Sequence, residues 1–154
     1  MKKTLLALLI ILCLVLTGCA KDKESAPLSC AAVAEQVQNA AAFAELTDAN
    51  EAYLEKYLMI EAEDLASWVM RRDATRATPE MILVLEVKAG ADQAAIKQAV
   101  QEYHDEQLFQ YRDYQPAQVF KLEDAKVMEN GAFIVLAVSP DAAKVSAALG
   151  NGWK

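Results

Sequence analysis

The stretch AKVMENGAFIVLAVSPD, residues 125–141, decides the fold of this chain. Two strand-like runs, 125–129 and 132–138, flank Asn130-Gly131, a pair that readily adopts the positive φ angles of a type I′ turn. The stretch therefore predicts a β-hairpin. Ser139 and Pro140 follow at once and predict an N-cap and first position of a last helix, which Gly150 should end.

Upstream of the hairpin, the hydrophobic pattern predicts two more strands and a long helix. Residues 81–87 form a nearly continuous apolar run, typical of a strand covered on both faces or central in a sheet. Residues 65–71 are predicted to form the strand that precedes the 81–87 strand. A helix should begin at Asp92 and end before Pro116, because proline disfavours helical geometry in the residue that precedes it.

The first third of the domain has helical periodicity. Ser29 is a candidate N-cap for a helix that should run to about Leu46, and a shorter helix should follow Asn50. The buried side of the shorter helix should consist of Tyr53, Leu54, Tyr57 and Leu58. The predicted class is α+β, in the order ααββαββα, with an antiparallel sheet of about four strands and helices packed on one face.

The N-terminus carries a targeting signal. Lys2 and Lys3 precede the apolar run 5–16, which is too short for a permanent membrane span and ends at Leu16-Thr17-Gly18-Cys19. This motif resembles the lipobox of bacterial lipoproteins. The resemblance implies cleavage before Cys19, acylation of its thiol with a diacylglyceryl group (palmitate chains), and anchoring on the extracytoplasmic face of the cell membrane. The alternative is an ordinary secretory signal with a chance cysteine.

These features predict three regions: a signal peptide (1–18), a lipidated N-terminus and tether (19–28), and a single domain (29–154). Removal of residues 1–18 leaves 13 basic and 22 acidic side chains, a formal charge of −9. Such a surface repels phosphate backbones, so we expect no nucleic-acid partner. Cys13 leaves with the signal and Cys19 is acylated, so Cys30 would be the one free thiol and no intramolecular disulfide could form.

The second half of the chain is similar to a known family. The similarity rests on a lipobox followed by three motifs. These are the segment Tyr114-Gln115-Pro116, the hairpin around Asn130-Gly131, and the helix start Ser139-x-Asp141. Over residues 45–149 the chain resembles the domain-of-unknown-function family 4358, uncharacterised lipoproteins of Gram-positive bacteria. The resemblance implies a cell-surface lipoprotein, and it assigns no catalytic residues.

Two groups of side chains are candidates for catalysis or metal binding. Cys30 and His104 could form a thiol–imidazole pair if the fold brings them together, but Cys30 shares an apolar stripe with Val33 and His104 falls on the expected wet side of its helix. Glu102 and Glu106 share a helix face near His104 and Asp105. That spacing is poor for a metal, and we favour a solvated charged face.

Two further groups are candidates for binding. One group consists of three arginines that are close in sequence in an otherwise acidic chain: Arg71, Arg72 and Arg76. Their guanidinium groups could bind a carboxylate or phosphate; the alternative is that they form ion pairs with nearby acidic residues. The other group is aromatic and could form a binding surface or the end of the core. Its members are Tyr103, Phe109, Tyr111 and Tyr114.

The sequence as a whole favours a lipid-anchored extracytoplasmic protein that is a non-catalytic binding or scaffolding module of the cell envelope. Its expected partners are the membrane, through the diacylglyceryl group on Cys19, and an envelope protein or small ligand. We expect no cofactor and no metal. The alternative is a small envelope enzyme, such as a thiol-dependent hydrolase using Cys30. A transporter's solute receptor is disfavoured, because such receptors usually need two lobes around a cleft.

Overall fold

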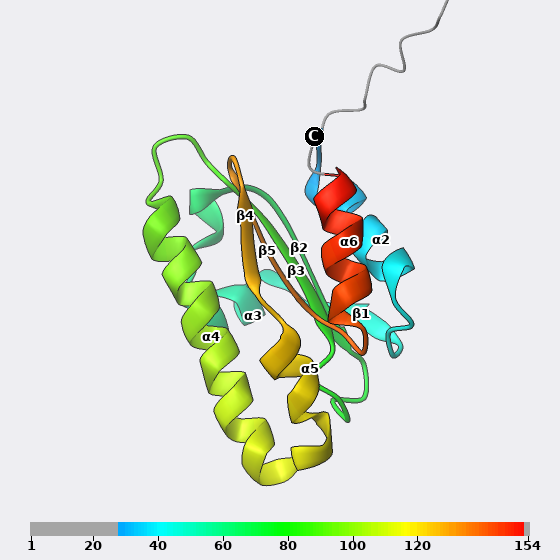
Figure 1. The fold of residues 1–154 in the computed structure, drawn as a ribbon. Coiled ribbons are helices and arrows are strands. Elements are labelled where there is room, and N and C mark those ends of the chain that lie inside the picture. The colour runs from blue at the N-terminus through cyan, green and yellow to red at the C-terminus, as the bar shows by residue number, and fades with distance from the viewer. Residues whose placement is uncertain (1–27, 153–154) are drawn as a thin grey trace, which may run out of the picture.

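The computed structural model describes residues 28–152 and places a five-stranded antiparallel sheet between two layers of helices (Figure 1). The strand order is β1-β2-β3-β5-β4. The strands are β1 (Leu46–Asp48), β2 (Leu65–Asp73), β3 (Met81–Val87), β4 (Val127–Asn130) and β5 (Phe133–Val138). This arrangement confirms the predicted α+β class.

Helices cover both faces of the sheet, which corrects the prediction of a single helical layer. The helices α2 (Cys30–Ala40) and α6 (Ala142–Gly152) pack on one face. The other face carries three helices: α3 (Glu51–Tyr53), α4 (Gln93–Tyr114) and α5 (Val119–Asp124). The π-helical turn Leu54–Leu58 continues α3, and the 3₁₀ turn Pro116–Gln118 precedes α5. A further 3₁₀ turn, Ala62–Asp64, leads into β2.

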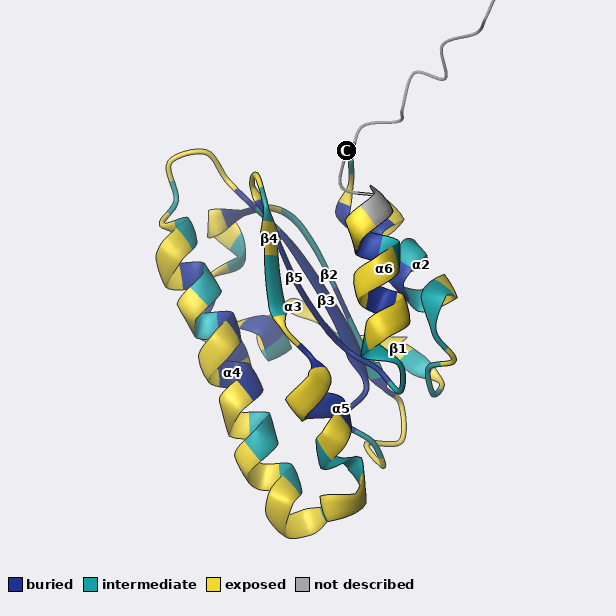
Figure 2. Ribbon diagram, viewed as in Figure 1, coloured by how far each residue is buried: buried dark blue, intermediate teal, exposed yellow. Residues whose placement is uncertain are grey.

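Two layers are needed because β3 and β5 are apolar on both of their faces. Leu83 and Leu85 of β3 point into the core beneath α4, whereas Ile82 and Val84 point into the core beneath α2. All six residues of β5 are buried (Figure 2). A helical layer on one side alone would have left half of these side chains in water.

The fifth strand arises from a segment that the sequence predicted as helix. The first helix ends at Ala40, and Leu46–Asp48 pairs with the end of β2, with Leu46 opposite Asp73 and Asp48 opposite Arg71. A strand of three residues has too short an alternation to be recognised from its sequence, so the prediction of a helix to Leu46 and of four strands was wrong here.

The hairpin and the last helix are present, with the turn, the cap and the helix end shifted. The helix continues to Gly152, which corrects its predicted end at Gly150. Asn130 pairs with Phe133, so the turn is Gly131-Ala132, and Gly131 has a positive φ of 56° as the first turn residue. A glycine at this place is typical of a type II′ turn and corrects the predicted type I′ turn. Helix α6 begins at Ala142, and the Asp141 carboxylate accepts the N–H of Lys144 at 3.1 Å, so Asp141 acts as the cap instead of Ser139.

Candidate functional site

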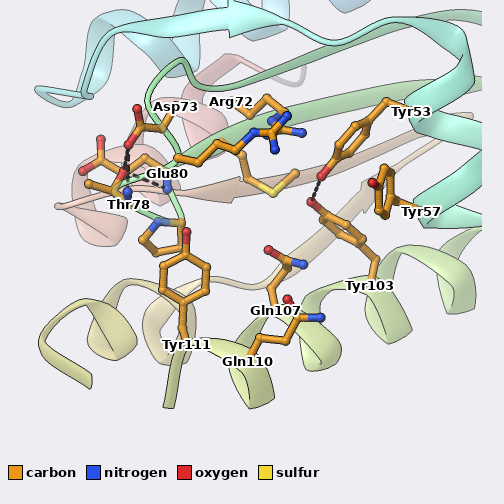
Figure 3. A pocket seen from close by; sticks show the side chains of 13 residues that line it. Tyr53, Tyr57, Arg72, Asp73, Thr78, Glu80, Tyr103, Gln107, Gln110 and Tyr111 are labelled. Atoms are coloured by element: carbon orange, nitrogen blue, oxygen red, sulfur yellow. Dashed lines mark hydrogen bonds between the residues drawn. The ribbon is translucent and has the colours of Figure 1, made fainter. Parts of the chain in front are cut away.

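A cleft of about 300 Å³ opens on the α4 face of the sheet, between α4, the α3 segment and the loop that joins β2 to β3 (Figure 3). We call it the tyrosine cleft. It is lined by Tyr53, Tyr57, Tyr103 and Tyr111, by Arg72 and Arg76, by Gln107 and Gln110, and by Asp73 with residues 78–81.

Three of the four tyrosines of the cleft form a connected group, whereas Tyr111 lies apart from them, on the side of Thr78 (Figure 3). The rings of Tyr53 and Tyr57 have centroids 4.3 Å apart, and the hydroxyl oxygens of Tyr53 and Tyr103 are 3.2 Å apart (Figure 3). Burial, together with Tyr53, raises the pKa of Tyr103, and burial raises the pKa of Tyr111. These phenols therefore keep their protons at neutral pH and can donate hydrogen bonds to an acceptor.

Arg72 provides an unpaired positive charge in the cleft. Its guanidinium carbon lies 4.3 Å from the centroid of the Tyr53 ring, a cation–π contact. Within residues 28–152, its side chain makes no hydrogen bond and no ion pair, although it is half-buried. A guanidinium prefers a planar, two-oxygen partner such as a carboxylate or phosphate, so this side chain is free to accept one from outside.

The second arginine, Arg76, stands on a loop that its neighbours hold rigidly. The buried carboxylate of Asp73 accepts four hydrogen bonds, each of 2.8 Å, from the backbone N–H and hydroxyl groups of Thr75 and Thr78. Burial acts to raise the pKa of Asp73, but these hydrogen bonds outweigh it and lower the pKa to about 2. Arg76 itself has a positive φ of 61°, a conformation that costs a non-glycine residue about 1–2 kcal/mol.

The remaining carboxylate of the cleft is already neutralised. Glu80 is buried and its Oε1 lies 2.5 Å from the Nζ of Lys121, which is also buried. The other oxygen of Glu80 accepts the N–H of Ala44 at 2.6 Å. Both carboxylates in the lining, Asp73 and Glu80, therefore have their oxygens occupied, which leaves the two arginines as the charged groups of the cleft that can receive a ligand.

The structure divides the candidate binding residues into two sets. Arg72, Arg76, Tyr103 and Tyr111 meet in the tyrosine cleft. Arg71 points to the opposite face, because successive side chains alternate along a strand, and it bonds Asp48 at 3.1 Å and Gln38 at 2.7 Å. Two aromatic candidates lie outside the cleft and are exposed, Phe109 by 66% and Tyr114 by 85%.

Nine of the thirteen residues that line the cleft were not predicted as site residues, and four of the nine come from helical segments. Tyr53 and Tyr57 were predicted only as the packing side of a short helix, and nothing local indicates that they face Arg72. Gln107 and Gln110 carry a signal that was available. They lie four and seven positions after Tyr103, the spacing of one helix face, and Tyr111 follows at position eight.

The thiol and the imidazole do not meet. Cys30 is the first residue of α2 and is buried against the sheet, where its sulfur accepts the Ser67 hydroxyl at 3.2 Å, and burial raises the pKa of the thiol. His104 belongs to α4 on the other face of the sheet. It is buried, which corrects its expected place on the wet side of the helix, and its Nε2 lies 2.8 Å from the carbonyl oxygen of Leu122. A buried, protonated thiol without a base is a poor nucleophile.

The acidic residues around His104 form a solvated face. Glu102, Asp105 and Glu106 are exposed, and Gln98, Gln101 and Gln110 donate hydrogen bonds to them, respectively. No cluster of three or more His, Cys, Asp or Glu side chains in residues 28–152 is arranged to hold a metal ion.

The predicted leader falls outside this description. Lys2, Lys3, the motif 16–19 with Cys19, and the tether up to residue 27 lie beyond the described residues. In the described part of the chain, no helix combines the length and the apolar character needed to cross a bilayer.

Comparison with known protein families identifies a family for this chain. Residues 39–139 match a family model described as a domain of unknown function (DUF4358). This span contains the β2–β3 loop, α4, the hairpin and every residue that lines the tyrosine cleft. No curated protein and no solved structure matches the chain.

Proposed function

Since this chain belongs to the family described as a domain of unknown function (DUF4358), we propose its role from the tyrosine cleft: it is a non-catalytic binding module that captures an anionic ligand. The ligand's carboxylate or phosphate would contact Arg72, with Arg76 and the tyrosine hydroxyls around it. Such a site has the usual composition of a small-molecule pocket, with aromatic walls and a few polar groups that fix orientation.

The unpaired guanidinium of Arg72 is the observation that carries this proposal. A half-buried positive charge without a partner has lost part of its hydration and has gained only the contact with Tyr53 in return. An oxyanion that binds there would form charge-assisted hydrogen bonds, which are roughly twice as strong as neutral ones. The neighbouring Arg71 already donates hydrogen bonds to Asp48 and Gln38, so it is not available to bind an external anion in the same way.

Binding is favoured over catalysis because the tyrosine cleft offers donors but no activated base or nucleophile. Its carboxylates, Asp73 and Glu80, are saturated by donors from the chain itself. Tyr103 and Tyr111 are held protonated, and the thiol of Cys30 lies on the other face of the sheet. This arrangement suits retention of an anion and gives no route for proton abstraction.

The module would be anchored at the outer surface of the cell membrane by a diacylglyceryl group on Cys19. Two observations fit this location. Helix α2 follows the tether directly, and the tyrosine cleft lies on the opposite face of the sheet from α2. A ligand could therefore reach the cleft without passing the face that joins the anchor.

Binding can be tested with minimal anions. Inorganic phosphate and acetate should shift the NMR signals of the Arg72 Nε–H group and of the Tyr103 and Tyr111 rings in a saturable manner. Arg72→Ala should weaken the affinity at least tenfold, whereas Arg71→Ala, the neighbouring arginine with its own partners, should leave it unchanged. If both variants bound alike, or if neither anion shifted these signals, the cleft would not be an anion site.

The anchor has its own test. Intact mass spectrometry of the membrane-extracted protein should give residues 19–154 plus the diacylglyceryl group. Cys19→Ser should release the protein or leave it as an uncleaved precursor. An unchanged membrane partition and unchanged gel mobility of this variant would contradict lipid anchoring. Cys30→Ala should retain ligand binding in full, since its thiol has no part in the cleft.

A further inference from the structure

A second hollow adjoins the tyrosine cleft and shares its arginines. It has a volume of about 220 Å³ and is lined by residues of β1, the start of α3 and the β2–β3 loop, among them Thr47, Asn50 and Ala74. We call it the outer hollow. Four residues line both spaces: Tyr53, Arg72, Asp73 and Arg76. The two arginines therefore stand between two spaces and not at the closed end of one.

This placement determines where the charge of a ligand would lie. If the tyrosine cleft alone were the site, an anion at Arg72 would be the end of the ligand. With a hollow on each side of the arginines, the ligand can continue in both directions from its anionic group. The tyrosine cleft is at the lower end of the roughly 300–1,000 Å³ of small-molecule sites, so occupation of both spaces gives a more usual binding volume.

The linings indicate the kind of chain that fits. The tyrosine cleft offers tyrosine hydroxyls and the amides of Gln107 and Gln110, and the outer hollow offers Thr47 and Asn50. These groups donate and accept hydrogen bonds as hydroxyl-rich ligands require. A peptide that binds by adding a strand would need a free strand edge. Between the two spaces the edge of β2 is taken by β1, with Thr47 opposite Arg72, so a peptide strand could add only along the other edge of β1.

The charge of the chain sets a further limit. The protein has 22 acidic and 15 basic side chains, and the two spaces share one pair of arginines. Asp48 also lines the outer hollow, and its carboxylate is paired with Arg71. A polymer with a charge on every unit, such as a nucleic acid, would bring more negative charge than this pair can compensate. A ligand with one anionic group among neutral hydroxyl-bearing groups fits better.

We infer that the ligand is a linear acidic oligosaccharide, bound with an internal carboxylate between Arg72 and Arg76 and with one sugar arm in each of the two spaces. This inference rests on the proposed function and adds the chain length and the class of the ligand. The rigid loop explains why a strained residue is kept at position 76, since the four hydrogen bonds of Asp73 hold Arg76 at the junction.

The test compares ligand lengths against the full-length protein by isothermal titration calorimetry. A hexuronic acid monomer should bind weakly. A linear trisaccharide in which one central hexuronic acid is flanked by two neutral hexoses should bind at least tenfold more tightly, because only the trisaccharide reaches both spaces. Ala74→Trp would fill the outer hollow and should abolish this gain, so that the variant binds the monomer and the trisaccharide alike. Ala77→Trp is the matched control, because this exposed alanine of the same loop lines neither space, and it should retain the gain.

The outcomes separate this inference from the proposed function. Equal affinity for monomer and trisaccharide, or a gain that survives Ala74→Trp, would overturn the extended ligand but leave anion binding at Arg72 in place. A length-dependent gain for a phosphodiester chain or an acidic peptide, and not for the uronate, would overturn the oligosaccharide assignment. If no uronate bound, and phosphate and acetate also failed to bind through Arg72, the proposed function itself would fall.

Discussion

The guanidinium carbon of Arg72 lies 4.3 Å from the centre of the Tyr53 ring, and this contact joins two segments that are far apart in the chain. Tyr53 comes from the short helix α3 and Arg72 from the penultimate position of β2. Their meeting creates the junction between the tyrosine cleft and the outer hollow. The consequences of this contact, of two other polar interactions and of two glycine positions can be measured.

Arg72→Ala should separate binding from stability. The variant loses one partly exposed cation–π contact and no ion pair, so we expect urea denaturation to show a loss of about 1 kcal/mol or less. Anion binding should fall at least tenfold in the same preparation. Arg72→Lys keeps the charge but lacks the planar fork, and it should recover only part of the affinity. A large loss of stability in Arg72→Ala would mean that the arginine is a structural residue.

The buried pair between Glu80 and Lys121 should behave differently from a surface ion pair. Lys121→Met leaves the Glu80 carboxylate buried without its cation and should cost about 3–5 kcal/mol of unfolding free energy. The double variant Glu80→Met/Lys121→Met should recover much of this loss, because neither charge then remains buried. Arg112→Met, which breaks the exposed pair with Glu123, is the control and should change little. Equal effects of Lys121→Met and Arg112→Met would contradict the buried geometry.

Asp73 should make the stability of the fold depend on acid. Its pKa of about 2 in the folded protein is below the ordinary value of 3.8, so the folded state favours the ionised form. This contribution is complete above about pH 4 and is lost as the pH falls towards 2. Asp73→Asn should therefore be clearly less stable than wild type at pH 6, and the difference should shrink at pH 2.5. Urea denaturation at both pH values measures it, and a constant difference would refute the role of the carboxylate charge.

Substitution by alanine should change the stability of the protein in opposite directions at two glycines that have equal space around them. Neither Gly131 nor Gly150 has an atom within 4 Å of the position that a Cβ would take. Gly131 has a φ of 56°, so Gly131→Ala should destabilise the protein by about 1–2 kcal/mol. Gly150 lies in helix α6, where alanine is favoured by up to about 1 kcal/mol. Thermal denaturation should give a lower midpoint for the first variant and an equal or higher one for the second.

Elements with strong local patterns were predicted closely. The strand β3 has the bounds expected from its apolar run, Met81–Val87, and α4 ends at Tyr114, just ahead of Pro116. The hairpin was located correctly, but its turn was displaced by one residue because Asn130 joins the strand pairing with Phe133. The short strand β1 was missed, since its existence depends on the end of β2 and not on its own three residues.

The candidate site was predicted as two separate groups, one of arginines and one of aromatics. Each group contributed two residues to the tyrosine cleft, Arg72 with Arg76 and Tyr103 with Tyr111. The others were excluded by direction: Arg71 faces the opposite side of the sheet, and Phe109 and Tyr114 face solvent. Side-chain direction follows from the strand register and from the face that a helix buries, and both are set by contacts between distant segments.

Periodicity and turn chemistry are local properties, so the sequence by itself determined the α+β class, the strand 81–87, the presence of the hairpin, and the long helix after Asp92. The tertiary structure alone decided that helices cover both faces, that Cys30 and His104 lie apart, and that Tyr53 meets Arg72. The physical reason is that these outcomes depend on which buried surfaces pack together. That choice is made by the whole core at once, and no window of neighbouring residues contains it.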